Sequence, residues 1–410
     1  MVSTAPVSAF TRVAQLASDR RVHQAFQWLH IHEQQILRWQ AELVAVAAPP
    51  FGERQRAEWL CERFRQLELE DVQLDGVGNV IGIRRGAESS GRCLLVSAHI
   101  DTVFPAETVI EPVIHGTRLQ APGACDNGAG VVALLALAAA LKQAHIEPDC
   151  DVIFAGNVGE EGEGNLRGMR HIYEVAEWRD RIAAHLVLDG AGHEVAVVDA
   201  LGSRRYLVTL RGPGGHSWTD AGRPNPIVAL SQAIARLGEM PLNELPRTTF
   251  NVGMIEGGTA INAIPEWAAA RFDFRSSDPE QLIRLEVELH RAVEDAVLAA
   301  NGHAHNGGKR GNALQFSIET IGSRPAGRLE HNAPLYELLR AVDRHLNIRT
   351  EPRIASTDAN IPLSLGVPAI GLGAGGEGGG IHTRAEWYDA KGRELGLRRI
   401  LLLLLAMSAN

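Results

Sequence analysis

The sequence predicts an α/β protein whose helix-flanked, mostly parallel sheet is interrupted by a smaller inserted domain. Three apolar runs have the length and β-branched content of buried strands, and they cover residues 93–98, 152–155 and 185–188. Helical patterns separate these runs, as is typical of parallel strands covered by helices. The pattern changes near residue 204 and returns to its first form after residue 321, so the chain is expected to leave the first domain and come back to it.

Helices and a hairpin are expected to surround these strands. Apolar spacing predicts helices over residues 22–48 and 53–67, and Pro49-Pro50 ends the first of them. Alternation predicts a hairpin whose turn is Asp75-Gly76. Further helices are predicted over residues 131–143, from residue 166, over residues 334–346 and at the apolar run 400–407.

The inserted segment shows a β-α-β-β-α-β order, as in a ferredoxin-like α+β domain. Its predicted elements are a strand at 205–211, a helix at 226–238, strands at 248–255 and 268–274, a helix at 279–299 and a strand at 314–321. The predicted domain bounds are therefore 1–203 and 322–410 for the two parts of the first domain, and 204–321 for the insert.

Composition excludes several classes of protein. The chain has 410 residues, of which 45% are hydrophobic and 22% charged, as is typical of a soluble globular protein. The net charge of −9 argues against a nucleic-acid partner. The apolar runs 131–141 and 400–407 are shorter than the roughly 20 residues that span a bilayer, so no membrane partner is expected. The four cysteines form no Cys-x-x-Cys pair, and with no signal peptide at the N-terminus they are expected to be free thiols in the cytoplasm.

Residues with ligand-type side chains stand at the ends of the predicted strands. His99 and Asp101 follow the first strand, Glu160 and Glu161 follow the second, and Asp189 follows the third. In open α/β sheets, ligands collect beyond the carboxyl ends of the strands. We therefore expect these side chains to converge at one edge of the sheet.

Alternative interpretations exist for each position. Asp126 stands among glycines where a helix begins, so it could be an N-cap. Glu160 and Glu161 could form a solvated acidic loop, and Asp101 could cap a helix beside a loop histidine, His99. The glycines near Asp126 follow neither Gly-x-Gly-x-x-Gly nor Gly-Lys-Ser/Thr, so no nucleotide site is expected. The absence of a Gly-x-Ser-x-Gly elbow disfavours a serine nucleophile.

A metal centre accounts for these residues together. Adjacent carboxylates repel, and burying both Glu160 and Glu161 in ionised form costs on the order of several kcal/mol unless a positive charge lies between them. A divalent metal ion would bind one of them and leave the other free to move protons. His382, which follows a glycine-rich stretch, is a further candidate ligand.

These residues and their neighbours resemble the M20 family of metallopeptidases, which includes carboxypeptidases, di- and tripeptide aminopeptidases and N-acyl amino acid deacylases. The matching motifs are Ser97-Ala-His99-Ile-Asp101-Thr-Val, Gly123-Ala-Cys-Asp126-Asn-Gly-Ala-Gly, Gly159-Glu160-Glu161-Gly, Asp189-Gly and His382-Thr. The resemblance implies that His99 and Asp189 hold one metal ion, that Glu161 and His382 hold the other, and that Asp126 bridges the two. It also implies that Glu160 is the general base and that Asp101 orients His99.

The insert carries motifs of the same family. They are Gly212-Pro-Gly-Gly-His216-Ser, Gly257-Gly-Thr-Ala-Ile-Asn262-Ala-Ile-Pro and Asp273-Phe-Arg275. The resemblance implies that the insert is a lid that forms a homodimer, and that His216 reaches the partner's active site to stabilise the oxyanion. Asn262 and Arg275 match positions that face the substrate. A local turn hydrogen bond for His216 and a plain salt bridge for Arg275 remain the alternatives.

The predicted activity is hydrolysis of the amide bond of small peptides by two divalent metal ions. Two His, two Asp and one Glu suit Zn²⁺, with Co²⁺ or Mn²⁺ as alternatives. Asp189 favours an aminopeptidase, because many carboxypeptidase and deacylase relatives carry Glu there. An N-acyl amino acid deacylase or a carboxypeptidase is the alternative. A catalytically inactive binding protein is disfavoured, because none of the five implied ligands is missing.

Overall fold

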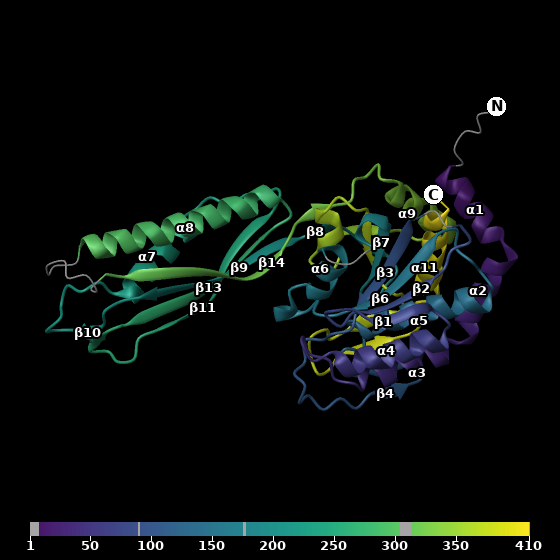
Figure 1. Ribbon diagram of the computed structural model, residues 1–410, viewed down its shortest axis with the longest axis horizontal. Coiled ribbons are helices and arrows are strands. Elements are labelled where there is room, and N and C mark those ends of the chain that lie inside the picture. Colours follow the sequence, from purple (N-terminus) through teal and green to yellow (C-terminus); the bar gives the residue numbers. More distant parts are fainter. Residues whose placement is uncertain (1–7, 89–90, 175–177, 304–312, 410) are drawn as a thin grey trace. The chain divides into compact units, whose positions relative to one another are not determined.

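The computed structural model describes residues 8–88, 91–174, 178–303 and 313–409, which belong to two compact units. The first unit comprises Met1–Ala200 and Arg328–Asn410, and the second comprises Leu201–Gly327. The second unit is therefore an insertion in the chain of the first (Figure 1).

The first unit is built on a nine-stranded sheet of order β1-β2-β6-β3-β7-β17-β8-β15, with β16 beside β8. Its strands are β1 (Glu70–Leu74), β2 (Val80–Arg84), β3 (Cys93–His99), β6 (Asp151–Asn157), β7 (Ile182–Leu188), β8 (Val195–Ala200), β15 (Gly327–Arg328), β16 (Glu351–Ala355) and β17 (Ala369–Leu372). The neighbours β6, β3, β7 and β17 are parallel, whereas β1, β2 and β8 join antiparallel neighbours. This arrangement confirms the predicted α/β fold with a mainly parallel central sheet.

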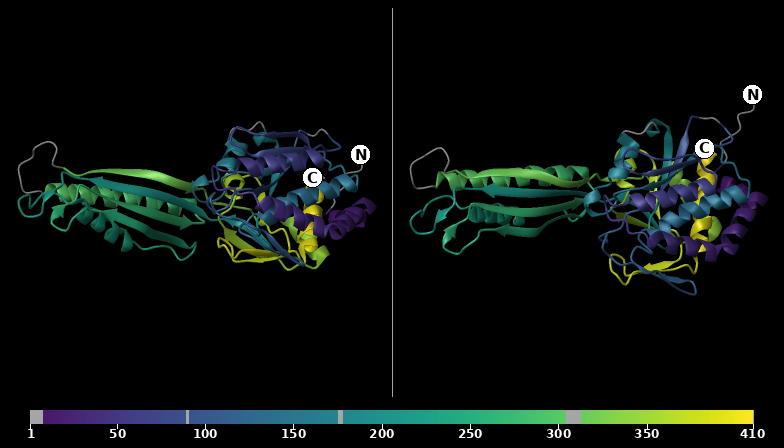
Figure 2. Two further views of the ribbon diagram at one scale, coloured as in Figure 1. Left: turned by 90° about the horizontal axis from the view of Figure 1, so that it is seen from below. Right: turned by 60° about the horizontal axis from the view of Figure 1, so that its bottom comes forward.

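Helices cover both faces of this sheet. Side chains alternate between the faces along each strand, and the central strands place apolar side chains on both faces, so both must be covered. Leu94 and Val96 of β3 pack on one face in the large core formed with helices α1 to α5, α9 and α11, whereas Leu95 packs on the other face with α6 and α10. Figure 2 shows helices on both sides of the strands of this unit. The helices are α1 (Ala9–Ser18), α2 (Arg20–Ile31), α3 (Glu33–Val44), α4 (Arg54–Gln66), α5 (Gly128–Gln143), α6 (Arg167–Glu174), α9 (Pro334–Leu346), α10 (Asn360–Ser364) and α11 (Arg393–Ser408).

Helices α5 and α11 contain the two longest apolar runs of the sequence, and both helices are buried over most of their length. A helical stretch that is apolar all round must be covered on every side, and the positions of these two runs in the core provide that cover. Within the described ranges, none of the helices combines the length and the apolar character that crossing a bilayer requires.

The predicted helix over residues 22–48 is two helices. The chain leaves α2 at His32, whose φ of −97° and ψ of 16° lie outside the helical range, and it re-enters a helix at Glu33. Trp28 stacks on His32 at this break, with ring centroids 4.4 Å apart. Apolar periodicity continues through the break because both helices bury one face against α5, so periodicity alone does not reveal it.

A small antiparallel sheet of order β18-β19-β5-β4 was not predicted. It contains β4 (Val113–His115), β5 (Arg118–Gln120), β18 (Glu377–Gly379) and β19 (Trp387–Asp389). Part of the glycine-rich stretch before His382 is therefore a strand. Glycine is required there by close packing, since a Cβ on Gly378 would lie 2.3 Å from the Cys125 sulfur.

The second unit is an antiparallel sheet of order β11-β13-β9-β14, with α7 and α8 packed on one face (Figure 1). Its main elements follow the predicted β-α-β-β-α-β order. They are β9 (Gly202–Arg211), α7 (Pro226–Gly238), β11 (Thr248–Gly257), β13 (Trp267–Ser276), α8 (Pro279–Gly302) and β14 (Gln315–Arg324), with the short pair β10 (Gly215–His216) and β12 (Ala263–Ile264).

Candidate metal centre

The carboxyl ends of three neighbouring parallel strands carry the candidate ligands of the first unit. His99 is the last residue of β3 and lies opposite Asn157, the last residue of β6. Glu160 and Glu161 follow β6, and Asp189 follows β7. Because these strands are parallel and in this register, their ends lie at one edge of the sheet, as the sequence predicted.

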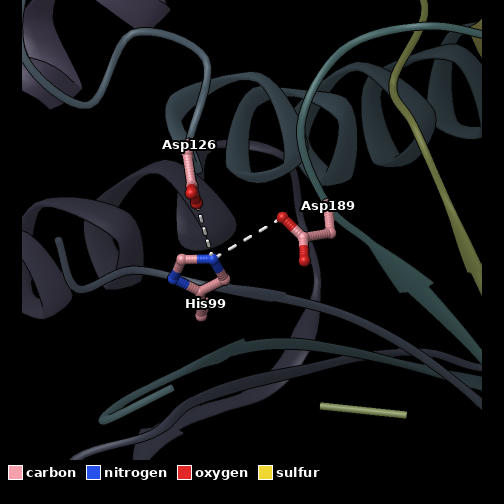
Figure 3. A group of neighbouring side chains, drawn as sticks. All are labelled: His99, Asp126 and Asp189. Carbon is pink, nitrogen blue, oxygen red and sulfur yellow. Dashed lines mark ion pairs between the residues drawn. The ribbon is translucent and has the colours of Figure 1, made fainter. Parts of the chain in front are cut away.

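One group of possible ligands consists of His99, Asp126 and Asp189 (Figure 3). The Nε2 atom of His99 lies 3.1 Å from Oδ1 of Asp126 and 3.7 Å from Oδ1 of Asp189. His99 is buried, with 2% of its surface exposed, whereas the two aspartates keep partial contact with solvent. One imidazole nitrogen therefore faces two carboxylates.

A second group consists of Asp126, Glu161 and His382. The Nε2 atom of His382 lies 3.1 Å from Oδ2 of Asp126 and 3.0 Å from Oε1 of Glu161. Asp126 thus belongs to both groups, and each of its two oxygens faces a different histidine.

Asn127, and not Asp126, caps helix α5. Its Oδ1 atom accepts hydrogen bonds from the N–H groups of Gly130 at 3.0 Å and Gly190 at 3.1 Å, and its amide donates to the carbonyl of Leu188 at 2.9 Å. The N-cap interpretation of Asp126 is therefore wrong. The carboxylate of Asp126 faces the two histidines, and Asn127 ties the start of α5 to the chain around Asp189.

Asp101 holds two parts of the centre together. Its carboxylate accepts hydrogen bonds from the backbone N–H groups of Glu160 at 3.0 Å and Glu161 at 2.8 Å. Its carbonyl lies 3.2 Å from Nδ1 of His99, and its carboxylate lies 3.6 Å from the same nitrogen. The helix-cap interpretation of Asp101 is therefore wrong, and its main chain contacts the imidazole more closely than its carboxylate does.

Two buried residues near the centre, Arg56 and Asp358, were not among the candidate site residues named from the sequence. Arg56 of α4 is 1% exposed and donates to the carbonyls of Val46 and Ile100, each at 2.9 Å. Burial lowers the pKa of Arg56 to about 10, while the nearby Asp101 opposes that shift. Asp358 accepts a hydrogen bond from the Asn157 amide at 2.7 Å, and burial raises its pKa to about 7. An arginine on the apolar face of a predicted helix was the available signal for Arg56.

The charges of the centre suit bound cations. Hydrogen bonding to Asp126, together with the nearby Glu161, raises the pKa of His382 to about 9, although partial burial opposes this. Burial raises the pKa of Glu161. The possible ligand atoms of each group lie within 4.8 Å of one another. Imidazole and carboxylate donors at such spacing form the donor set of divalent transition metals, so the residues fit a pair of ions that share Asp126.

The predicted residues of the insert lie in the second unit. The backbone N–H of Ser217 donates to the carbonyl of Asn262 at 3.0 Å, so His216 and Asn262 stand on adjacent turns. The Nδ1 atom of His216 accepts a hydrogen bond from the Trp218 N–H at 3.2 Å, which is the turn contact that the sequence left open. An imidazole that accepts at Nδ1 carries its proton on Nε2. Arg275 donates from Nε to Asp273 at 2.7 Å, so it forms the salt bridge that was its alternative role.

Residues 95–406 match peptidase family M20/M25/M40. Among curated relatives, the uncharacterised protein YqjE of Bacillus subtilis (strain 168) is 24% identical over 373 residues, covering 87% of this chain and 94% of that protein. A succinyl-diaminopimelate desuccinylase of Burkholderia ambifaria is 26% identical over 280 residues, covering 64% of this chain and 72% of that enzyme.

Solved structures share the fold. A tripeptidase of Staphylococcus aureus subsp. aureus Mu50 superimposes with a TM-score of 0.74 at 22% identity, covering 92% of this chain and 99% of that one. Aminopeptidase PepT of Bacillus cereus ATCC 10987 gives 0.72 at 21% identity with the same coverage. YxeP of Bacillus subtilis, described as a dinuclear metal-binding peptidase of the M20 family, gives 0.68 at 16% identity, covering 93% and 99%.

The family match includes every strand end and loop that carries the two ligand groups. It also extends through the whole insert and most of α11. This chain therefore belongs to peptidase family M20/M25/M40 and is a hydrolase that acts on peptide or amide bonds.

Proposed function

We propose that the protein is a dinuclear metal-dependent exopeptidase that cleaves small peptides in the manner of an aminopeptidase. The shared carboxylate of Asp126 carries this proposal, because its oxygens lie 3.1 Å from Nε2 of His99 and 3.1 Å from Nε2 of His382. A carboxylate that bridges two ions has this arrangement, and paired ions are a common solution for hydrolysing amides.

The five ligands divide between two ions. His99 and Asp189 would hold the first, Glu161 and His382 the second, and Asp126 both. The mixture of imidazole and carboxylate favours Zn²⁺, with Co²⁺ or Mn²⁺ as alternatives. Such ions, when bound, supply the positive charge that polarises a carbonyl and lowers the pKa of water.

Glu160 is the proposed general base. It is 6% exposed, and its backbone is held by the Asp101 carboxylate beside that of Glu161. In the proposed reaction Glu160 accepts a proton from the attacking water and then delivers it to the leaving amine nitrogen. Glu161 is engaged with His382, so the two adjacent acids have different tasks.

His216 is proposed to donate from Nε2 to the oxyanion that forms on the substrate carbonyl, and to do so in the active site of a second copy. The hydrogen bond from Trp218 to Nδ1 supports this, because it leaves the proton on Nε2. The insert is accordingly proposed as the dimerisation and lid domain. Two more residues of the insert are proposed to contact the substrate. They are Asn262, on the turn beside His216, and Arg275, whose guanidinium would bind the free carboxylate of the substrate.

Mixing two inactive variants tests whether His216 acts across a dimer. Glu160→Gln and His216→Ala should each lose most turnover alone. After the two are unfolded and refolded together, mixed dimers should regain part of the activity, because the site with an intact Glu160 receives an intact His216 from its partner. No recovery, with mixed dimers demonstrated by two different tags, would contradict action in trans.

The alternative is an N-acyl amino acid deacylase or a carboxypeptidase on the same scaffold. The similarity to a desuccinylase, an enzyme that removes an acyl group, supports this alternative. The aminopeptidase is placed first because Asp189 stands where many deacylase and carboxypeptidase relatives carry Glu. Likeness to PepT and to a tripeptidase agrees with this order.

A substrate panel separates the two activities. Free di- and tripeptides, N-acetyl and N-succinyl amino acids, and N-blocked dipeptides are offered to chelator-treated protein to which Zn²⁺, Co²⁺ or Mn²⁺ is restored. Cleavage of free peptides, with N-blocked peptides left intact, is expected. Cleavage of acylated substrates alone would establish the alternative, and no turnover of any amide with both ions bound would refute the proposed function.

The proposed location is the cytoplasm. All four cysteines are buried and unpaired, as expected for a reducing compartment. Burial raises the pKa of both Cys93 and Cys125 to about 12, so these thiols are not expected to ionise and act as nucleophiles or ligands.

A further inference from the structure

Glu386 makes an unusual set of contacts with the loop that carries Asp126. It is fully buried, and its carboxylate accepts three backbone N–H groups: that of Gly123 at 2.9 Å, that of Cys125 at 2.8 Å and that of Asp126 at 2.8 Å. The carbonyl of Glu386 also accepts the N–H of Ala121 at 3.1 Å. One residue thus binds the loop along its length from a position about 260 residues away in sequence.

The same residue is joined to His382 by two consecutive turns. The N–H of Thr383 donates to the carbonyl of Gly380 at 3.0 Å, and the N–H of Glu386 donates to the carbonyl of Thr383 at 3.2 Å. His382 itself has a φ of 64°. This is the left-handed region, which residues other than glycine occupy at a cost of about 1–2 kcal/mol. Such a conformation persists where the surrounding contacts hold it.

These contacts form a closed ring. From His382 the chain leads through the turns to Glu386, from the Glu386 carboxylate to the backbone of Asp126, and from the Asp126 carboxylate back to Nε2 of His382 at 3.1 Å. The small sheet supports this ring. Strand β19 begins directly after Glu386, and it pairs with β5, which precedes the Asp126 loop. The separation of two ligands from distant segments is therefore set by local hydrogen bonds.

A carboxylate is well suited to accept the three backbone N–H groups that Glu386 binds. A buried carboxylate costs free energy unless hydrogen bonds compensate, and Glu386 lies close to another carboxylate, that of Asp126. Three N–H donors on two carboxylate oxygens offset part of this cost, although burial still raises the pKa of Glu386. A glutamine has a single oxygen, and its amide N–H₂ would meet the N–H of Gly123, so an uncharged residue of the same size cannot make the same contacts.

We propose that Glu386 is a positioning residue of the metal centre, which holds the shared carboxylate of Asp126 at the correct distance from His382. The inference rests on the proposed dinuclear function and adds a residue that acts on the ions through Asp126. Residues that orient metal ligands typically contribute about 10–100-fold to metal affinity.

Asp75 provides a matched control. Its Oδ1 atom also accepts three backbone N–H groups of a loop in the same unit, those of Val77 at 3.0 Å, Gly78 at 3.0 Å and Asn79 at 2.9 Å. Neither Asp75 nor its loop belongs to the groups of possible ligands. Asp75 contacts the segment before Glu160 indirectly, through the Asn79 side chain, which donates to Asp75 at 2.6 Å and accepts the Val158 N–H at 3.0 Å, whereas Glu386 binds the backbone of Asp126 directly. Loss of Asp75 should therefore destabilise a loop and affect the metal centre far less than loss of Glu386.

The test measures metal binding to the full chain after removal of metal by a chelator. Zn²⁺ is titrated against a chromophoric chelator for the wild type, Glu386→Gln, Glu386→Ala, Asp75→Asn and Asp75→Ala, and the Co²⁺ absorption spectrum is recorded for each. The Glu386 variants should bind at least one ion about 10–100-fold more weakly and shift the Co²⁺ bands. The Asp75 variants should lower the unfolding temperature of the metal-free protein, weaken metal binding by less than about threefold and leave the Co²⁺ bands in place.

Two results overturn the inference and are distinguishable. If the wild type binds two ions and both Glu386 variants bind them with unchanged affinity and spectrum, Glu386 is not a positioning residue and the proposed function stands. If the wild type binds fewer than two ions, the dinuclear function and the role of Glu386 fall together. Should Glu386→Ala fail to fold, Glu386→Gln, which keeps the size of the side chain, decides between these outcomes.

Discussion

Single atoms of Asp126 connect the two halves of the metal centre. Its Oδ1 faces His99 and its Oδ2 faces His382, so a rotation of one carboxylate changes both groups of possible ligands at once. The position of the Asp126 backbone therefore matters, and side chains near it hold the surrounding backbone by hydrogen bonds. Asn127 fixes the chain after Asp126, and Asp101 fixes the backbone of Glu160 and Glu161.

Replacement of Glu160 should separate turnover from metal binding. We expect Glu160→Gln to lower kcat by about 10²–10⁴-fold, because the amide cannot accept a proton from water. Both ions should remain, because the candidate ligands are other residues, and elemental analysis of the purified variant checks this. The control is Glu163→Gln, since Glu163 is exposed on the same loop and should be neutral. A near-normal rate for Glu160→Gln would remove Glu160 from the role of base.

His185 should make stability depend on pH. It is fully buried between the Ser97 hydroxyl at 2.8 Å and the Tyr173 hydroxyl at 3.2 Å, and burial lowers its pKa to about 3. The folded state therefore keeps His185 neutral while the unfolded chain takes up a proton below pH of about 6.5. The stability contributed by the neutral ring is complete above that pH and is lost as the pH falls.

The measurement compares the free energy of unfolding of the wild type and His185→Gln from pH of about 7.5 to about 5. Glutamine does not titrate, so the wild type should lose about 2 kcal/mol relative to the variant over this range. A difference that stays constant with pH would show that His185 is not held neutral by the fold.

At the scale of elements, the register of parallel strands decides which residues meet. His99 lies opposite Asn157 across β3 and β6, and β7 runs parallel beside β3, so the residues that follow each strand emerge at the same edge. Helix α5 begins at that edge and brings Asp126 into it. The small sheet brings the C-terminal candidate ligand, His382, because β18 and β19 enclose the turn that carries it.

Strand β18 should tolerate no side chain at Gly378. A Cβ there would lie 2.3 Å from the Cys125 sulfur, so we expect Gly378→Ala to lower stability by about 1–3 kcal/mol. The added change Cys125→Ala removes that sulfur and should restore part of the loss. Gly238→Ala is the control, since nothing lies within 4 Å of a Cβ at Gly238. Equal melting temperatures for Gly378→Ala and the wild type would contradict the close packing.

At the scale of the whole molecule, the chain leaves the first unit after Ala200 and returns at Arg328, so the candidate ligands come from both sides of an insertion. The second unit has its own core and a sheet whose outer strands are β11 and β14. Strand β11 exposes Met254 and Ile255, at 56% and 58%. A long edge strand with exposed apolar residues is normally covered, and a second copy of this chain is the cover that we propose.

A charge on β11 should therefore break the dimer. We expect light scattering to give about twice the chain mass of 44.3 kDa for the wild type, and Ile255→Lys to shift the protein towards the monomer. The control is Ile31→Lys, because Ile31 of α2 is 63% exposed in the first unit. A wild type that is monomeric at the working concentration would contradict the dimer, and a dimeric Ile255→Lys would place its interface elsewhere.

Local patterns in the sequence determined the main strands and helices, their order, and the ligand-type residues at the strand ends, because periodicity and strand termini are properties of neighbouring residues. The helices over residues 226–238 and 334–346 were predicted with the bounds that the structure has. Local patterns could not show the break at His32 or the small sheet, since both depend on what packs against them.

The tertiary structure alone decided how the site is assembled. That Asn127 caps α5, that Asp126 faces two histidines and that Glu386 holds its loop follow from contacts between segments up to about 260 residues apart. A hydrogen bond of about 3 Å depends on the positions of both partners, and only the folded chain brings such partners together.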